Sequence, residues 1–287
     1  MGNAQDSSKI RKAAEAGDSS GLRKMMKGAK GGTHSALLNQ TDSGGRSALH
    51  IASQNGHLET VQLLLEGGAD PCLADSNDET AVTAAIQLNR LDILEALCRS
   101  KPSCLTAPPL PLVAAAESGH DKIVTFLLEM GADPSGREDN GKTPLVAAIC
   151  KGHRSCAEVL LAAGANPNDG TIPPRVKSPL LAACSKLFGS ADICKLLLDA
   201  GANPSTATAD GWTALHQSCL DGCFKQIALL IENGADPYQT NADGKDSFAI
   251  VKETYSASNA AGLVSLLNGE KIDMSEESAV WKQVSQQ

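Results

Sequence analysis

Apolar residues recur along the chain at a spacing that predicts pairs of short helices. Within residues 47–71, Leu49 and Ala52 lie about one turn apart on a first predicted helix. Val61 and Leu64 have the same spacing on a second predicted helix. Helices this short cannot bury their apolar faces alone, so we expect each pair to stack against the next pair in the chain.

The residues at the helix ends predict where each helix begins and ends. Ser47 is suited to cap the first helix through its side-chain oxygen. Gly56 and Gly68 would end the first and second helices, because glycine readily adopts the left-handed conformation at a helix C-terminus. Pro71 prevents further helix and favours an extended excursion. Each unit is therefore a helix, a turn, a second helix and a hairpin.

Two short phrases show that this unit repeats. The first phrase follows the second helix and reads GGADP at 67–71, MGADP at 130–134, AGANP at 163–167, AGANP at 200–204 and NGADP at 233–237. The second phrase opens the first helix and reads SALHIA at 47–52, TPLVAA at 143–148, SPLLAA at 178–183 and TALHQS at 213–218. With weaker starts at Thr80, Leu110 and Asp246, the units begin 33, 30, 33, 35, 35 and 33 residues apart.

A period near 33 residues with these phrases resembles the ankyrin repeat family over residues 42–268. The resemblance implies an all-α fold, an ankyrin-repeat α-solenoid in which each repeat is a helix-turn-helix plus a hairpin and a capping helix pair closes each end. It also implies a non-enzymatic protein-binding role as an adaptor, scaffold or inhibitory subunit. Partners of such proteins contact the hairpin tips and the concave face of the inner helices.

The resemblance and the composition of the ends divide the chain into five parts. They are a flexible N-terminus at 1–7, N-terminal capping helices and a linker at 8–41, six ankyrin repeats at 42–245, a C-terminal capping repeat at 246–268 and a tail at 269–287.

The charge balance argues against a nucleic-acid binder. The 287 residues include 33 Asp and Glu against 25 Lys and Arg, a net charge of −8, whereas nucleic-acid affinity comes mainly from basic groups that neutralise phosphates. Neither 254–269 nor 102–116 resembles a membrane span, and the first residues lack the apolar core of a secretory signal. We therefore expect a cytoplasmic or nuclear monomer that needs no cofactor and keeps its nine cysteines as reduced thiols.

A metal-binding or enzymatic protein is one alternative. Cys150, His153 and Cys156 are residue types that suit zinc, but a structural zinc site needs four ligands. His153 also occupies the position that opens the second helix of its repeat, where the resemblance implies a structural histidine. Because no base and nucleophile pair stands outside the repeats, we predict neither a metal site nor catalytic residues.

Function is therefore expected on the surface that stacking creates. The predicted partner-binding residues are Glu79, Lys142, Lys151, Arg175, Lys177, Phe188, Trp212 and Tyr238. Trp212 is the strongest single anchor because tryptophan is enriched at interface hot spots. Packing of the same side chain against a neighbouring hairpin is the alternative interpretation.

Two departures from the repeat predict where specificity lies. The hairpin between Cys104 and Leu110 is short and rich in proline, which would leave a notch. The hairpin before Ser178 and the helix connection after it are each two residues longer, and the hairpin carries Arg175 and Lys177. This arrangement predicts a basic patch in the later repeats, which suits a partner with an acidic surface.

Two modifications are also predicted. The start of the chain resembles an N-myristoylation signal at Gly2, although Asp6 stands where the motif has Ser or Thr. Residues 1–30 hold seven Lys or Arg against three Asp or Glu, a net of +4, so a membrane-tethered adaptor at the membrane periphery is an alternative function. Asn168 lies in a hairpin sequence resembling those in which ankyrin asparagines are hydroxylated, and we predict it as a hydroxylation site.

Overall fold

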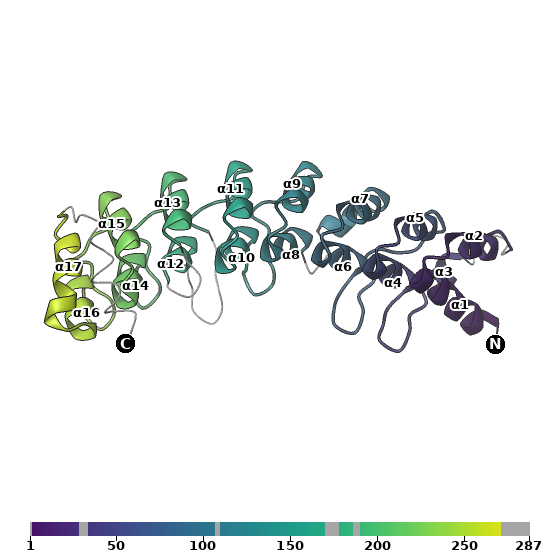
Figure 1. Ribbon diagram of the computed structural model, residues 1–287, viewed down its shortest axis with the longest axis horizontal. Coiled ribbons are helices and arrows are strands. Elements are labelled where there is room, and N and C mark those ends of the chain that lie inside the picture. Colours follow the sequence, from purple (N-terminus) through teal and green to yellow (C-terminus); the bar gives the residue numbers. More distant parts are fainter. Residues whose placement is uncertain (1, 29–33, 107–109, 170–177, 186–189, 271–287) are drawn as a thin grey trace. The chain divides into compact units, whose positions relative to one another are not determined.

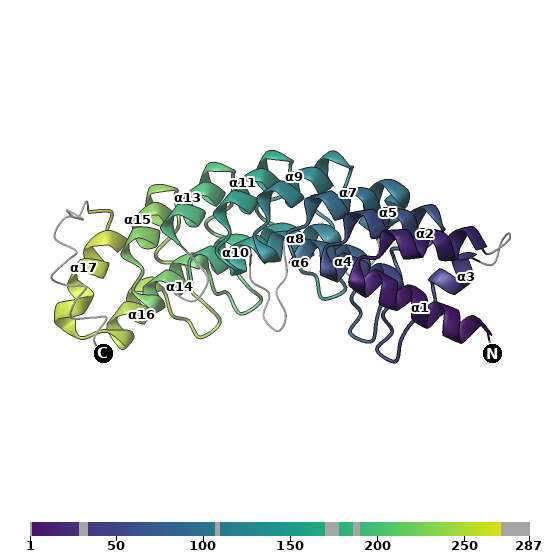
Figure 2. The same ribbon diagram turned by 45° about the vertical axis from the view of Figure 1, so that its right-hand side comes forward.

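The computed structural model describes residues 2–28, 34–106, 110–169, 178–185 and 190–270. These residues form two compact units, which lie within residues 1–138 and 139–287 and are called here the N-terminal unit and the C-terminal unit. In both units the described helices stand in two rows, an inner row on the side of the hairpins and an outer row (Figures 1 and 2). The predicted all-α repeat solenoid is confirmed.

The N-terminal unit has four helices in each row. The inner row is α1 (Gly2–Ala16), α4 (Ala48–Asn55), α6 (Ala81–Gln87) and α8 (Pro111–Ser118). The outer row is α2 (Ser19–Gly28), α5 (Leu58–Glu66), α7 (Leu91–Ser100) and α9 (Asp121–Glu129). The connections contain a short helix α3 (His34–Leu38) and a 3-10 turn η1 (Pro102–Leu105).

The C-terminal unit repeats this arrangement. Its inner row is α10 (Pro144–Cys150), α12 (Pro179–Ala183), α14 (Ala214–Asp221) and α16 (Ser247–Thr254). Its outer row is α11 (Arg154–Ala162), α13 (Ala191–Asp199), α15 (Phe224–Glu232) and α17 (Ala257–Leu267).

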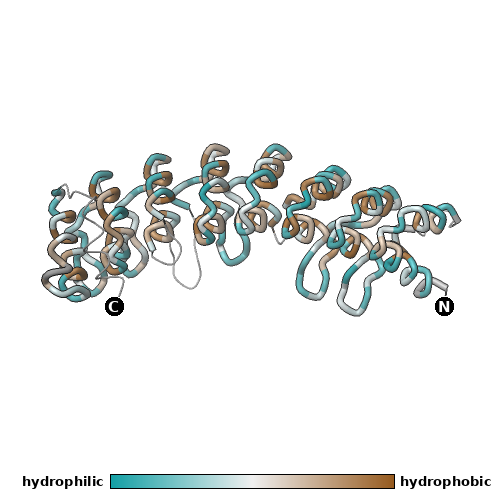
Figure 3. Tube along the Cα trace, in the orientation of Figure 1, coloured by the Kyte–Doolittle hydropathy of each residue, from teal (hydrophilic) through white to brown (hydrophobic). Residues whose placement is uncertain are grey.

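The apolar positions predicted from periodicity form the core between the rows. Leu49 and Ala52 on α4 and Val61 and Leu64 on α5 are all completely buried. Figure 3 shows the helices as largely hydrophobic where they pack, whereas the hairpins before α4 and α6 are largely hydrophilic. Burial is therefore spread along a continuous apolar layer within each unit, as stacked repeats require.

The helix caps follow the local sequence signals. Ser47 caps α4 by accepting a hydrogen bond from the His50 amide, and the His50 ring accepts one in return from the Ser47 amide. Thr213 and His216 form the same capping box at α14. Gly56 ends α4 with a φ of +78°, which glycine adopts without steric cost.

The same histidines also connect each repeat to the next hairpin. His50 Nε2 lies 2.8 Å from the Glu79 carbonyl oxygen, and His216 Nε2 lies 3.2 Å from the Lys245 carbonyl oxygen. Because a carbonyl only accepts, Nε2 carries the proton and Nδ1 is the acceptor within the cap. This geometry gives His50 and His216 a structural role.

The N-terminal boundary differs from the predicted one at residue 8. Helix α1 begins at Gly2 and includes most of the segment predicted to be flexible. Ser7 is only 3% exposed and continues the buried stripe of Ile10 and Ala14 by one helical turn. Ser7 is a small polar residue at a position where the stripe is otherwise apolar. The spacing of hydrophobic residues in the sequence therefore did not predict this turn of the helix.

Successive hairpins contact each other through backbone atoms. The Ser76 amide donates to the Gly44 carbonyl over 3.0 Å, and the Ala242 amide donates to the Asp210 carbonyl over 2.9 Å. Gly211, with a φ of +73°, lies so close to the next hairpin that a Cβ there would be 2.9 Å from Asn241 Cα. Gly244 has a similar φ of +71°, but a Cβ there would meet nothing within 4 Å.

We expect Gly211→Ala to destabilise the fold more than Gly244→Ala. Both alanines would adopt a left-handed conformation, at a cost of about 1–2 kcal/mol. Only the Gly211 variant also forces two backbones apart, which adds about 1–3 kcal/mol. Urea unfolding followed by circular dichroism measures both changes, and equal losses in the two variants would contradict the close contact between hairpins.

A pH dependence follows from the buried ring of His216. Burial lowers its pKa below the ordinary value, despite carbonyl acceptors that act in the opposite direction. An unfolded histidine titrates near pH 6.5, so the folding stability due to this group is fully present above that pH and is lost as the pH falls through the folded pKa. We expect the free energy of unfolding to decrease between pH 7 and pH 5 more steeply in the wild type than in His216→Gln. Parallel slopes would show that this histidine does not titrate differently on unfolding.

Candidate protein-binding surface

A polar groove runs along the inner face of the N-terminal unit. Two adjoining cavities of about 300 and 480 Å³ share Asp42, Arg46 and Gln54. We define the inner groove by the residues that line them: Ser8, Arg11, Lys12, Glu15, Asp42, Ser43, Gly44, Arg46, Ile51, Gln54, Asn55, Asp75, Ser76, Asn77 and Glu79. The groove is thus built by α1, by α4 and by the two hairpins that precede α4 and α6.

Some charged groups in the inner groove are already paired. Arg46 donates two hydrogen bonds to the Asp42 carboxylate, at 2.9 and 3.1 Å. Burial alone would raise the pKa of Asp42, but the hydrogen bonds from Arg46 and Gly44 hold it below the ordinary value. Arg11 donates to the Gln40 carbonyl over 3.1 Å. These groups shape the hairpin and the groove floor.

Other polar groups in the groove are uncommitted. Among the described residues, the side chains of Lys12, Glu15 and Gln54 have no hydrogen-bond or ion-pair partner. Near the end of α6, Leu88 is 49% exposed and adds an apolar contact to a mainly polar face. Free donors, free acceptors and an exposed apolar side chain are the contacts that a protein partner uses.

Glu79, a predicted partner-binding residue, lies in the inner groove. Its carboxylate accepts a hydrogen bond from the Gln87 amide group over 2.9 Å, which orients it beside the end of α6. Its carbonyl oxygen is the acceptor for His50. Its backbone therefore supports the fold while the residue lines the groove, and its role in binding stays a prediction.

Trp212 packs within its own repeat. Its ring stacks on the His216 ring with centroids 5.3 Å apart, and its Nε1 donates to Gln217 over 3.3 Å. The side chain is half-buried and lines a small cavity of about 70 Å³ with Asn168 and Leu181. The ring therefore covers a capping box and is itself half-buried.

Three of the other predicted residues of the C-terminal unit lie among the described residues. Tyr238 is 67% exposed and stacks on Phe248 with ring centroids 5.3 Å apart. Lys151 is exposed at the end of α10, and Lys142 is half-buried in the hairpin before it. Arg175, Lys177 and Phe188 lie outside the described residues. The predicted basic patch therefore stays a prediction.

Asn168, the predicted hydroxylation site, connects two repeats. Its side-chain oxygen accepts a hydrogen bond from the Asn203 amide over 2.7 Å, and its side-chain nitrogen donates to the Gly201 carbonyl over 3.2 Å. Asn39 makes a similar link in the N-terminal unit, where it accepts from the Asp70 amide over 2.8 Å. The geometry gives Asn168 a structural role, and its modification stays a prediction.

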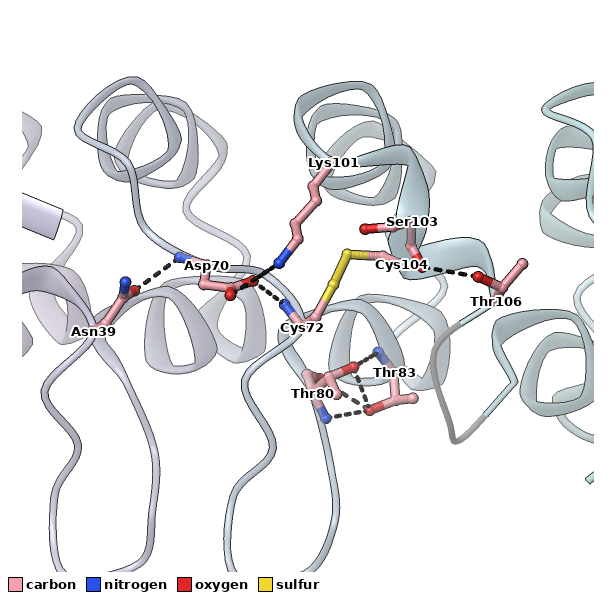
Figure 4. The surroundings of a disulfide bond; sticks show 9 residues. All are labelled: Asn39, Asp70, Cys72, Thr80, Thr83, Lys101, Ser103, Cys104 and Thr106. Atoms are coloured by element: carbon pink, nitrogen blue, oxygen red, sulfur yellow. Dashed lines mark hydrogen bonds and ion pairs between the residues drawn. A yellow bond between two sulfur atoms is a disulfide. The ribbon is translucent and has the colours of Figure 1, made fainter. Parts of the chain in front are cut away.

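The expectation that all cysteines are reduced thiols is wrong for one pair. Cys72 and Cys104 form a disulfide with Cα atoms 5.8 Å apart (Figure 4). A bond that closes this separation of 32 residues stabilises a fold by about 3–4 kcal/mol through the unfolded chain. The sequence signal was the spacing of about one repeat, which places both residues after an outer helix.

The remaining seven cysteines are not part of a disulfide. Cys184 and Cys194 lie buried with sulfur atoms 3.3 Å apart. Cys156 is buried on α11, so it faces the core. Within the part of the chain that the structure describes, no three His, Cys, Asp or Glu side chains are placed to hold a metal ion. No helix in the same ranges has both the length and the apolar content to cross a membrane.

Comparison with known proteins gives matches along most of the chain. Residues 10–107, 102–171 and 173–241 match the family described as ankyrin repeats (3 copies). The chain is 30% identical over 228 residues to palmitoyltransferase AKR1 of Lachancea kluyveri, which covers 75% of this chain and 30% of the relative. It is 30% identical over 211 residues to ankyrin repeat and SOCS box protein 16 of Mus musculus, covering 70% of this chain and 39% of the relative.

A third relative matches a shorter stretch. The neurogenic locus notch homolog protein 1 of Danio rerio is 32% identical over 111 residues, which is 37% of this chain and 5% of the relative. The chain thus spans less than two fifths of the length of each of these curated relatives.

We expect Asn168→Ala to weaken the joint between two repeats of the C-terminal unit. The change removes two hydrogen bonds at a partly exposed site, which should cost about 0.5–1.5 kcal/mol each. Asn168→Asp keeps the acceptor for Asn203 and loses only the donor, so its loss should be smaller. Hydrogen exchange at the Asn203 amide checks this order, and an unchanged rate in the alanine variant would contradict it.

Proposed function

Because the chain belongs to the ankyrin-repeat family, we propose that it is a non-enzymatic adaptor whose protein partner lies in the inner groove of the N-terminal unit. Ankyrin repeats mediate protein–protein interaction. The observation that carries the proposal is the groove itself, in which Lys12, Glu15 and Gln54 face solvent with uncommitted polar groups. Trp212 and Tyr238 supply further contacts on the C-terminal unit.

The charges of the groove indicate what the partner presents. Lys12 and Glu15 lie on α1, whereas Asp75 and Glu79 lie on the second hairpin, so groups of both signs line the groove. A partner with both signs of charge would complement these groups better than a uniformly acidic one. Leu88 offers an apolar contact beside the acidic hairpin. The acidic partner predicted from the later repeats would instead contact Lys142 and Lys151.

The activity named for the Lachancea kluyveri relative is not part of the proposal, because the match spans 30% of that protein. A cytoplasmic location and lipidation of Gly2 stay hypotheses from the sequence. Gly2 is the first residue of helix α1, and in the same helix Asp6 and Lys9 form an exposed ion pair at 3.4 Å.

A matched pair of substitutions tests the groove. Gln54→Arg places a long charged side chain where the two cavities meet, and Gln62→Arg makes the same change on the exposed side of α5. A partner recovered by crosslinking affinity purification should bind the wild type and Gln62→Arg alike, and should bind Gln54→Arg about tenfold more weakly, a loss of about 1.4 kcal/mol.

Circular dichroism of both variants controls for folding. Crosslinks from the partner should fall on α1, on α4 and on the hairpins before α4 and α6. Equal binding by both variants, or crosslinks confined to the outer helices, would exclude the inner groove as the binding surface.

A further inference from the structure

The Cys72–Cys104 disulfide stands where other joints of the fold use hydrogen bonds. Asn39 holds the loop after α5 through the Asp70 amide, and Asn168 holds the corresponding loop of a later repeat. Cys72 follows Asp70 by two residues and holds the loop after α7 by a covalent bond to Cys104. A hydrogen-bonded link opens and closes spontaneously, whereas a disulfide opens only when its bond is reduced.

An ion pair lies beside the disulfide. Lys101 Nζ lies 2.8 and 2.9 Å from the two carboxylate oxygens of Asp70, and the Cys72 amide donates to the same carboxylate over 2.9 Å (Figure 4). Burial would raise the pKa of Asp70, but these bonds hold it below the ordinary value. The two charged side chains are 42% and 33% exposed. Salt therefore screens this pair, and it cannot replace a covalent link.

The disulfide is directly continuous with the inner groove. Cys72 leads into the hairpin whose residues Asp75, Ser76 and Asn77 line the groove. Ser76 holds the far end of this hairpin by donating its amide hydrogen to the Gly44 carbonyl. The hairpin is thus fixed to the preceding repeat by hydrogen bonds and to the following repeat by the disulfide.

The two sulfur-bearing residues differ in access. Cys72 is half-buried, whereas Cys104 is 3% exposed. Disulfide exchange begins when an incoming thiolate attacks one of the two sulfurs, and access decides which sulfur is attacked. The arrangement favours attack at Cys72, with Cys104 as the leaving group.

We propose that Cys72 is a thiol–disulfide exchange site at which a low-molecular-weight thiol opens the bond to Cys104 and releases the hairpin that forms one wall of the inner groove from the following repeat. The regulatory consequence rests on the proposed function of that groove. The incoming thiolate bonds to Cys72 Sγ, the bond to Cys104 Sγ breaks, and Cys104 leaves with the electron pair and takes up a proton. A second thiol then attacks the mixed disulfide and releases Cys72. In total, two electrons pass to the protein and two small thiols are oxidised to one small-molecule disulfide. In the reverse reaction, that disulfide oxidises Cys72 and Cys104 and re-forms the bond between them.

Burial keeps three other thiols of the chain out of this exchange. Burial raises the pKa of Cys98 to about 11 and that of Cys219 to about 12. Burial also raises the pKa of Cys184, whose sulfur lies against that of Cys194. The thiolate is the reactive form of a cysteine. These buried thiols therefore stay protonated and inaccessible while the Cys72–Cys104 disulfide exchanges.

Reduced glutathione added to the full chain tests the proposal. Rapid acid quenching followed by peptide mass analysis should find the glutathione adduct on Cys72 before any on Cys104. Amide hydrogen exchange across residues 74–79 should become about tenfold faster after reduction, while exchange in α14 and α15 stays unchanged. A first adduct on Cys104, or unchanged exchange in the hairpin, would overturn the proposal.

Two variants separate the chemistry from folding. Cys72→Ser with Cys104→Ser should show the fast hairpin exchange without glutathione and no response to it. Cys150→Ser removes a half-buried thiol that is not part of the disulfide and should respond as the wild type does. If the double variant responds to glutathione in the hairpin, the disulfide is not the site of control.

Binding distinguishes this proposal from the proposed function. A partner that binds the oxidised chain at least tenfold more tightly than the reduced chain supports both. A partner that binds both forms equally, through the groove, refutes the regulation and leaves the adaptor function in place. A glutathione adduct and a loosened hairpin, with no partner that depends on Gln54, support the exchange site and refute the groove as the binding surface.

Discussion

His50 and His216 each use both ring nitrogens, one inside their own repeat and one on the carbonyl of the next hairpin. Each ring completes a helix cap and at the same time fixes where the following repeat sits. A helix pair of this length depends on its neighbour for burial, so the apolar contact supplies the stability and the histidine sets the register. Protonating the acceptor nitrogen of His216 would break its bond within the cap, so the fold holds this ring in its neutral form.

The joints on the outer side of the fold follow the same logic with different chemistry. Asn39 and Asn168 bridge from the loop after one outer helix to the loop after the next. Cys72 makes the corresponding link covalently. Hairpins add backbone contacts between repeats, such as the bond from Ser76 to Gly44. The link between successive repeats is therefore an asparagine hydrogen bond at some positions and a disulfide at another. The side chain at each position sets how firmly two repeats are held together.

The sequence predicts the repeat, its helices and its caps well because these signals are local. Ser47, Thr213 and Gly56 act within a few residues of themselves, and they occupy the predicted conformations. The disulfide was not predicted, because Cys72 and Cys104 meet only when two loops of different repeats are in register. The groove was predicted only in outline, since the partners of Arg46 and Glu79 depend on how the hairpins stack.

The division between committed and uncommitted polar groups explains how one fold can carry a variable surface. Caps and joints use side chains whose hydrogen bonds are complete, so changing them costs stability. Lys12, Glu15 and Gln54 face the groove without such bonds among the described residues, so changing them leaves the stack intact. Glu79 combines both roles, because its backbone carbonyl holds the joint while its carboxylate lies in the groove. Since the backbone supplies the joint there, the side chain at that position can change without loss of the joint.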